Sequence, residues 1–164
     1  MKIIVAAFGK LKAPGLREAA DYYVRLGQSF NELEEIELKP SPLPDKSAAS
    51  RVKAQTQDGE ILQSTLEKRT GSRRRVVLLD EKGPAKPTLG WAKIVQTAQD
   101  QGVSELVFCV GSSMGFSDHV RKEAHAVLGF GAQTLPHELA RVVLLEQIYR
   151  ALAVLKNHPY HNEG

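Results

Sequence analysis

The stretch that decides the fold is Glu105-Leu106-Val107-Phe108-Cys109-Val110, which continues directly into Gly111-Ser112-Ser113-Met114-Gly115. The first part is almost entirely apolar and is typical of a buried strand. Glycines after such a strand permit positive φ and let a ligand approach the main chain. Ser117 can then cap a helix whose first N–H groups are free. In parallel sheets, ligands sit at this end of the strands.

The glycine loop lacks the two best-known phosphate-binding patterns. It contains no G-x-G-x-x-G, and no Gly-Lys-Ser/Thr follows it. An ordinary tight turn from strand to helix is therefore the simpler interpretation of the loop alone. A competing interpretation is a nucleotide-dependent oxidoreductase or phosphotransferase. The chain lacks the glycine motifs that identify those two enzyme classes.

Outward from this segment, strands and helices are predicted to alternate along the chain. Further strands are expected at Lys2–Phe8, Leu33–Leu38 (with its acidic residues on an exposed face), Val76–Leu79 and Val127–Phe130. Helices are expected at Pro14–Leu26 (stopped by Gly27), from a Ser47 cap to about Thr70, from a Thr88 cap to Gln101, and over Glu138–Lys156. This order predicts an α/β fold with a largely parallel sheet and helices on both faces, in one domain spanning residues 1–164.

The composition is that of an ordinary globular domain. The chain has 164 residues, of which 42% are hydrophobic and 25% charged. Its formal net charge of +3 permits an anionic partner without requiring one. Cys109 is the single cysteine and is expected in the core, so we expect no intrachain disulfide and a reducing, cytoplasmic location. No apolar run approaches the roughly 20 residues of a membrane span, so no membrane association is expected.

A basic cluster lies between the second helix and the third strand. It consists of Lys68, Arg69, Arg73, Arg74 and Arg75, five cations in eight positions without an acidic residue. Such a cluster can contact phosphates. Cations are equally favoured at the solvated C-terminal end of a helix, so both interpretations stay open.

The last helix and the tail carry the other polar candidates. Arg141 is close to the preceding loop and is expected to face a ligand there, whereas His137 is expected only to begin the helix. Glu146 and Arg150 are four residues apart and can pair. The apolar positions of this helix cover more than one side, which predicts contact with the sheet and with a second subunit.

The tail segment His158-Pro159-Tyr160-His161 combines two histidines with a tyrosine. Histidine can act as a base near neutral pH, and tyrosine can stack on a nucleobase. A frayed terminus is the simpler interpretation of the tail in isolation. No further ligand cluster accompanies the histidines, so no metal is expected.

Taken together, these blocks resemble the ribosomal RNA large subunit methyltransferase H family, a minimal group of SPOUT methyltransferases. The resemblance covers nearly the whole chain, from the opening strand with Gly9-Lys10 through Val76–Asp80 and the glycine loop. Its most specific block runs from Thr134-Leu135-Pro136-His137 through residues 141–151 to the tail. One departure is Ser112, where the family usually has a second glycine. A preserved loop with a change in packing or in one hydrogen bond is expected.

The resemblance implies a C-terminal trefoil knot that binds S-adenosylmethionine (SAM), a homodimer, and action on the assembled ribosome. The substrate it implies is a pseudouridine in large-subunit (23S) ribosomal RNA, methylated at N3 without a metal. The residues it assigns to the cofactor are Leu79, Gly111, Phe130, Gly131, Ala132, Gln133, Thr134 and Leu135.

Methylation of an imide nitrogen requires loss of its proton, which predicts a base and a nearby cation. The hypothesis is that Arg141 lowers the cost of the imide anion. His158, Tyr160 and His161 would hold the base or accept the proton from across the dimer, and the sequence does not say which. A ribosome-binding factor that kept the fold and lost the chemistry is the alternative, with Ser112 as its support.

Overall fold

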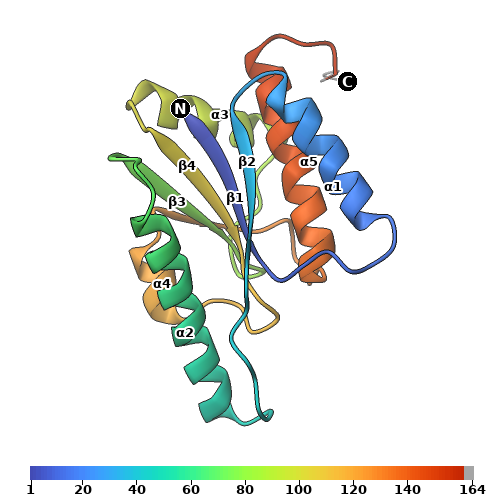
Figure 1. The fold of residues 1–164 in the computed structure, drawn as a ribbon. Coiled ribbons are helices and arrows are strands. Elements are labelled where there is room, and N and C mark those ends of the chain that lie inside the picture. The colour runs from blue at the N-terminus through green and yellow to red at the C-terminus, as the bar shows by residue number, and fades with distance from the viewer. Residues whose placement is uncertain (161–164) are drawn as a thin grey trace.

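Parallel hydrogen bonding joins all the strands into one sheet in the computed structural model of the chain, which describes residues 1–160 (Figure 1). The strands are β1 (Lys2–Phe8), β2 (Leu33–Leu38), β3 (Arg74–Leu79), β4 (Glu105–Val110) and β5 (Ala126–Leu128). The helices are α1 (Leu16–Gln28), α2 (Ala48–Glu67), α3 (Thr88–Asp100), α4 (Asp118–Glu123) and α5 (His137–Leu155). The strand order is β2-β1-β4-β3-β5, so the predicted parallel α/β sheet is confirmed.

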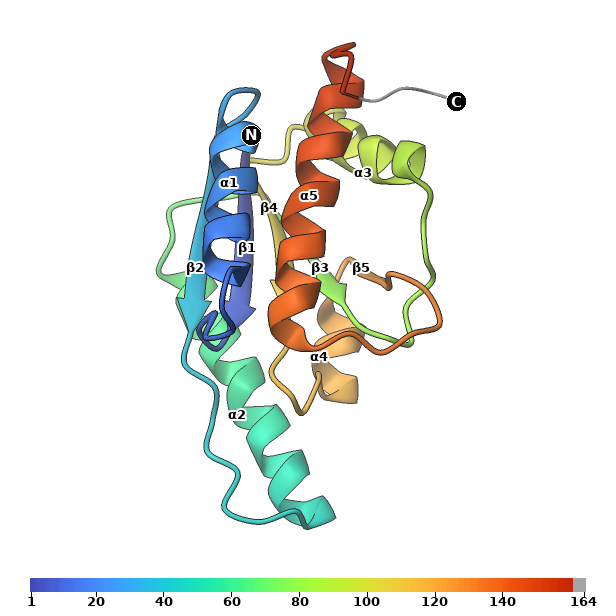
Figure 2. The same ribbon diagram turned by 90° about the vertical axis from the view of Figure 1, so that its right-hand side faces the viewer.

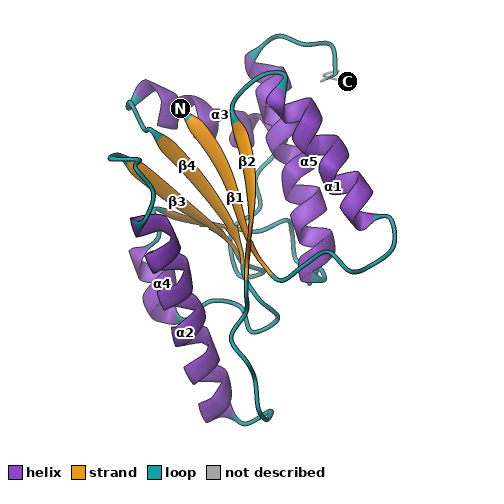
Figure 3. Cartoon of the chain, in the orientation of Figure 1, coloured by secondary structure: helices purple, strands orange, loops and turns teal. Residues whose placement is uncertain are grey.

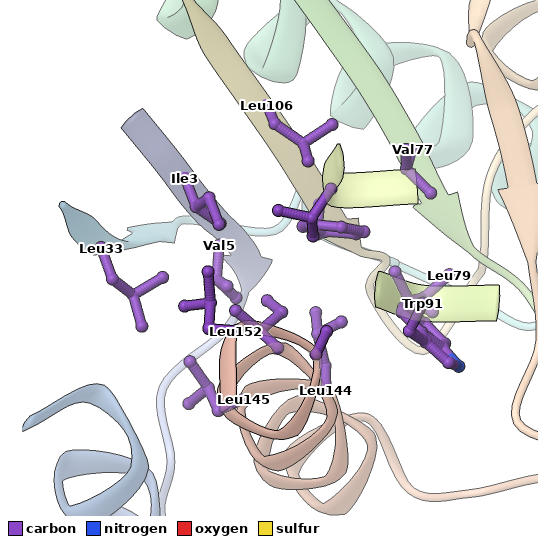
Figure 4. Close-up of a cluster of buried hydrophobic side chains, with 14 of the residues drawn as sticks. Ile3, Val5, Leu33, Val77, Leu79, Trp91, Leu106, Leu144, Leu145 and Leu152 are labelled. Atoms are coloured by element: carbon purple, nitrogen blue, oxygen red, sulfur yellow. The ribbon is translucent and has the colours of Figure 1, made fainter. Parts of the chain in front are cut away.

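Helices cover both faces of the sheet, as predicted (Figures 2 and 3). One layer contains α1, α5 and α3, and the other contains α2 and α4. Because successive side chains of a strand point to opposite faces, Ile3 and Val5 pack in the core under α5, whereas Ile4 and Ala6 pack in the core under α2. Figure 4 shows the first of these cores, where Leu144, Leu145 and Leu152 of α5 meet the sheet. Burying one such aliphatic side chain contributes about 1.5–3 kcal/mol.

The wide apolar surface of α5 is used mostly within its own chain. The helix packs against the sheet and lies between α1 and α3, so most of its length is enclosed (Figure 2). Val142, Leu145 and Leu152 are buried there, and Leu139 is 37% exposed. The two-sided pattern is therefore explained by neighbouring helices and does not by itself require a second subunit.

Several predicted boundaries are wrong for identifiable reasons. Gly27 lies inside α1 and does not end it. A Cβ at this position would lie 2.6 Å from Leu33 Cδ2, so the glycine makes room for Leu33. Thr88 is the first residue of α3, and Pro87 occupies the cap position without a side-chain hydrogen bond. Ser47 does cap α2 by accepting from the Ser50 N–H at 3.2 Å. The fifth strand ends at Leu128, two residues earlier than expected.

The acidic residues of β2 are exposed only in part: Glu37 is exposed as expected, whereas Glu34 and Glu35 are partly buried. Glu35 and Glu37 point toward α1 and α5, where Arg17 and Arg141 pair with them. The Glu35 side chain is 11% exposed. Buried charge of this kind is tolerated because it is paired and hydrogen-bonded.

Candidate active site

Three of the loops predicted to bind the cofactor leave neighbouring strands at one edge of the sheet. Leu79 at the end of β3 is the register partner of both Val110 in β4 and Leu128 in β5. Gly111 and residues 129–135 therefore begin next to Leu79 at the carboxyl end of the sheet (Figure 1). The structure thus brings together Leu79, Gly111 and the start of the last loop.

Glycine is required where the loop after β3 crosses the end of β5. The Asp80 N–H donates to the Leu128 carbonyl at 2.8 Å, and the Gly129 N–H donates to the Pro84 carbonyl at 3.1 Å. A Cβ on Gly83 would lie 2.4 Å from the carbonyl carbon of Leu128, and one on Gly129 would lie 2.5 Å from the oxygen of Gly83. The main chains touch, so neither position has room for a side chain.

The glycine loop after β4 is held in shape by its own residues and by α2. The Gly115 N–H donates to the Ser112 carbonyl at 2.9 Å, and Gly115 has a φ of +69°. Ser112 Oγ accepts from the Met114 N–H at 3.3 Å, and the Gln55 side chain donates to the Met114 carbonyl at 2.7 Å. Ser112 therefore fits a closed loop and adds one hydrogen bond to it. Ser117 caps α4 as predicted.

The loop after β5 presents main-chain groups without internal partners. Within residues 1–160, the backbone N–H and C=O groups of residues 130–135 form no main-chain hydrogen bonds. The loop is fixed at two points by side chains: Phe130 stacks on Trp91 with centroids 5.8 Å apart, and Thr134 Oγ1 donates to Glu81 at 2.7 Å. Trp91 is otherwise buried in the core. Free backbone donors and acceptors of this kind are suited to a polar ligand.

A buried ion pair between Asp80 and Arg121 was missed by the sequence analysis. Arg121 donates to Asp80 Oδ2 through Nε at 2.9 Å and through Nη2 at 2.7 Å, and the Asp80 side chain is 4% exposed. The pair connects the end of β3 to α4, directly beside the glycine loop. A carboxylate immediately after a buried strand was the available signal, since ligand sites in parallel sheets lie at that end.

Arg141 does not face the loop after β5. It is 2% exposed and is paired with Glu35 and with Glu37, the latter at 2.9 Å, and it donates to the Gly9 carbonyl at 3.2 Å. Its guanidinium therefore holds α5 to β1 and β2 and is enclosed within its own chain. His137 begins α5, as predicted.

The tail lies at the other end of α5 from the candidate cofactor loops (Figures 1 and 2). At 1.5 Å per residue, the 19 residues of α5 span about 28 Å, and Tyr160 folds back along this helix as far as Glu146. The His158 ring packs edge-on against Phe30 at 5.2 Å, and Tyr160 packs on Tyr149 at 4.5 Å. His161 lies outside the described residues. Within one chain, the structure does not bring the described tail residues to the cofactor loops.

Tyr160 is held by charged neighbours on α5. Its hydroxyl donates to Glu146 at 3.4 Å, and the Arg150 guanidinium lies 5.0 Å from its ring centre. Burial, followed by the Glu146 carboxylate, raises the pKa of Tyr160 to about 12. The predicted pairing of Glu146 with Arg150 is confirmed, with Arg150 Nε at 2.9 Å.

Most of the basic cluster at the amino end of the sheet is paired internally. Arg69 and Arg74 both donate to Glu105, at 3.2 and 2.6 Å, and Arg69 also pairs with Glu34 at 2.7 Å. Burial alone would raise the pKa of Glu105, but hydrogen bonds from these arginines lower it below its ordinary value. Arg73 donates to the Gln101 carbonyl at 2.8 Å. Much of this cluster therefore stabilises the fold.

Comparisons with known proteins show the family to which the chain belongs. A family model described as a predicted SPOUT methyltransferase matches residues 1–161. Ribosomal RNA large subunit methyltransferase H of Streptococcus gordonii is 38% identical over 164 residues, covering 98% of this chain and 99% of that protein. The chain belongs to the ribosomal RNA large subunit methyltransferase H family of SPOUT methyltransferases.

Further relatives of this family have similar identity over similar lengths. The methyltransferase H of Streptococcus thermophilus strain LMD-9 is 37% identical over 163 residues, and methyltransferase H 1 of Clostridium perfringens strain SM101 is 35% identical over 162. Each alignment covers 98% of this chain and 99% of the relative. The resemblance inferred from the sequence blocks is thereby confirmed.

Two features are absent from the described residues. Among residues 1–160, no helix combines the length and hydropathy needed to cross a membrane. In the same part of the chain, no three His, Cys, Asp or Glu side chains are grouped as metal ligands would be.

Proposed function

We propose that this chain transfers a methyl group from SAM to N3 of a pseudouridine in large-subunit ribosomal RNA, on the assembled ribosome in the cytoplasm. One observation carries the proposal: three neighbouring parallel strands deliver loops to one edge of the sheet, and the last of these has unpaired main-chain groups. The ribosomal RNA substrate is supported by the names of the relatives.

SAM would be held by Leu79, Gly111 and residues 130–135. These residues fit the cofactor because free N–H and C=O groups can bind its polar edges, while Phe130 on Trp91 offers an apolar surface. When bound, SAM supplies a methyl group activated by a sulfonium charge. The contribution of the chain is to fix the loops, so that the acceptor nitrogen is held at near-attack distance.

We infer that the active unit is a homodimer. The support is the separation of the tail from the cofactor loops along α5. The Tyr160 hydroxyl reaches Glu146, nine residues beyond His137 at the start of the helix, which is about 14 Å at 1.5 Å per residue. A second copy can supply its tail to the loops of the first. Exposed Leu139 at the beginning of α5 is one apolar residue available for that contact.

His158, Tyr160 and His161 are the proposed proton-handling residues. With its pKa raised to about 12, the Tyr160 phenol stays protonated at neutral pH, so it is assigned as a hydrogen-bond donor. We therefore propose the imidazole of His158 or His161 as the base for the imide proton. Arg141 is assigned as a positioning residue, because its enclosed guanidinium is committed to Glu35 and Glu37.

We also propose that the chain is one domain whose C-terminal segment is threaded as a trefoil knot. The support is the close crossing of residues 80–84 with residues 128–129, where Gly83 and Gly129 meet without side chains. Such threading is rare in proteins.

The test is to incubate the protein with radiolabelled SAM and ribosomes that lack the modification, and then to map the label. Label at a pseudouridine of large-subunit RNA supports the proposal. Saturable SAM binding without label in the RNA would exclude the assembled ribosome as the substrate. If the protein neither binds SAM nor labels the RNA, the alternative of a ribosome-binding factor without methyl transfer is left.

The tail assignment has its own test. A variant carrying His158→Ala, Tyr160→Ala and His161→Ala is expected to bind SAM as the wild type does and to lose methyl transfer. Full activity in this folded variant would exclude the tail from the reaction. Mixing it with Gly83→Ala chains, which keep the tail and are expected to lose SAM binding, then reports whether the tail acts across subunits. Activity in the mixture requires that the intact loops of one chain use the intact tail of the other.

A further inference from the structure

A cavity of about 260 Å³ lies between α3 and the edge of the sheet formed by β3 and β5. It exists because β5 pairs only with Val77–Leu79, so the first half of β3 has no neighbouring strand on this side. His125 takes that place with a main-chain bond from its N–H to the Val76 carbonyl at 2.9 Å. The cavity is separate from the candidate cofactor loops, which lie beyond Leu79 at the carboxyl end.

The cavity combines an apolar floor with a basic rim. Val77, Ile94 and Leu106 belong to the floor, whereas Arg75 and Lys93 belong to the rim. Lys86 and His125 complete the rim, and within residues 1–160 no carboxylate lines the cavity. Arg75, Lys86 and Lys93 give the rim three positive charges. The whole chain has a formal net charge of +3.

The rim cations are available to a ligand, in contrast to the neighbouring arginines. In the part of the chain that the structure describes, Arg75, Lys86 and Lys93 form no ion pair, whereas Arg69 and Arg74 do. His125 Nδ1 accepts from the Val76 N–H at 3.1 Å, so in the neutral ring Nε2 carries the hydrogen and can donate. A second hollow of about 280 Å³ adjoins the cavity and shares Arg75 and His125 with it.

We propose that this cavity binds one nucleotide of single-stranded RNA, with the base on the apolar floor and the phosphate on the basic rim. The inference rests on the proposed action on RNA and adds a binding site away from the reacting base. The volume lies slightly below the roughly 300–1,000 Å³ of small-molecule pockets, which suits a single nucleotide. Single strands are bound by cations for the phosphates beside a surface for the bases, and in this cavity the aliphatic side chains of Val77, Ile94 and Leu106 would provide that surface in place of aromatic rings.

The first experiment titrates the protein with uridine 5′-monophosphate while the methyl NMR signals of Ile94 and Ala126 are followed. Saturable shifts of these signals are expected. Lys93→Gln should weaken this binding by about tenfold, as loss of one charge-assisted hydrogen bond does. The matched control Lys53→Gln, on exposed α2 across the sheet, should change it less than twofold.

Three outcomes would overturn the proposal. They are shifts confined to other residues, equal effects of the two lysine variants, or inorganic phosphate binding as tightly as the nucleotide, which would leave no role for the floor. Thr97→Trp, which fills the cavity from α3, should abolish nucleotide binding while SAM binding is retained. If this variant does not fold, the comparison of nucleotide binding by Lys93→Gln and Lys53→Gln still tests the proposal.

The second experiment measures methyl transfer to ribosomes with the same lysine pair. Lys93→Gln should raise KM for ribosomes without changing kcat or SAM affinity, and should reduce the slope of log K against log salt by about 0.7, the value for one phosphate contact of a single strand. An unchanged KM and slope would contradict the inference. If the wild type transfers no methyl group at all, the proposed function fails, while the nucleotide titration still tests the cavity.

Discussion

At the carboxyl end of the sheet, β3, β4 and β5 run into loops in which glycines allow main chains to touch, whereas at the amino end arginine side chains pair with Glu34 and Glu105. The first end depends on the absence of side chains at Gly83 and Gly129. The second end depends on ion pairs between the side chains of Arg69 and Arg74 and those of Glu34 and Glu105. We therefore expect changes at the carboxyl end to affect cofactor binding as well as stability, and changes to the paired arginines at the amino end to affect stability without affecting cofactor binding.

The largest expected effect is at the carboxyl end. Gly83→Ala places a Cβ 2.4 Å from the Leu128 carbonyl carbon, which belongs to main chain and cannot rotate away. We expect a loss of about 3 kcal/mol in the free energy of unfolding, the upper range for overpacking, together with loss of SAM binding by calorimetry.

The matched control for this variant is Gly59→Ala in α2. Its Cβ would meet only Val120 Cγ2, at 2.6 Å, and because this valine has one preferred rotamer in the short helix α4, a small shift of α4 must relieve the contact. Since alanine is favoured over glycine in a helix by about 1 kcal/mol, stability should change little. Equal losses of stability in Gly83→Ala and Gly59→Ala would contradict the requirement for glycine where the main chains cross.

The next effect belongs to the amino end. Arg69→Ala leaves Glu34 without its arginine and Glu105, whose side chain is 7% exposed, with Arg74 alone. We expect a loss of about 2 kcal/mol in urea unfolding, less than for a fully buried pair because the site is partly exposed. SAM affinity should be unchanged, and Lys68→Ala next to it should have little effect. Weakened SAM binding in Arg69→Ala would break the contrast between the ends.

Acid should act on the same cluster. Hydrogen bonds from Arg69 and Lys2 lower the pKa of Glu34, and arginine hydrogen bonds outweigh burial to lower that of Glu105, both from an ordinary value of 4.5. Groups with depressed pKa values contribute stability above the unfolded value and lose it as pH falls through the folded value. Stability should therefore fall below about pH 4.5, and this fall should be shallower in Arg69→Ala. An identical pH profile in both proteins would contradict this assignment.

The smallest expected effect is Thr134→Val at the carboxyl end. It removes an exposed 2.7 Å hydrogen bond to Glu81, which should cost less than about 1 kcal/mol of stability. SAM affinity should nevertheless weaken a few-fold, because the loop loses one of its two attachments. The control Thr70→Val makes the same change in an exposed turn at the amino end and should leave both quantities unchanged.

The strands and helices could be predicted from the sequence because their signals are local. Alternating or continuous apolar runs marked all the strands, and Ser47 and Ser117 marked two helix starts. The boundary errors came from tertiary contacts: Gly27 was interpreted as a stop, whereas its missing side chain makes room for Leu33.

The candidate site was predictable only in part for the same reason. The strand ends follow from the parallel topology, so Leu79 and Gly111 could be placed together. The partners of Arg141 could not be predicted from the sequence. Glu35 is 106 residues away in the chain, and the pairing exists only once α5 covers β2. Likewise, nothing local distinguishes the paired Arg74 from Arg75 beside it.

The position of β4 between β1 and β3 also constrains how the protein is made. Lys2 is the register partner of Glu105, 103 residues later in the chain, so the first strand keeps an open edge during most of synthesis. At roughly 5–20 residues per second, that edge stays unpaired for several seconds or more, and the proposed cofactor loop after β5 is completed later still. A nascent chain therefore cannot become a catalyst on the ribosome that is making it until almost all of it has emerged.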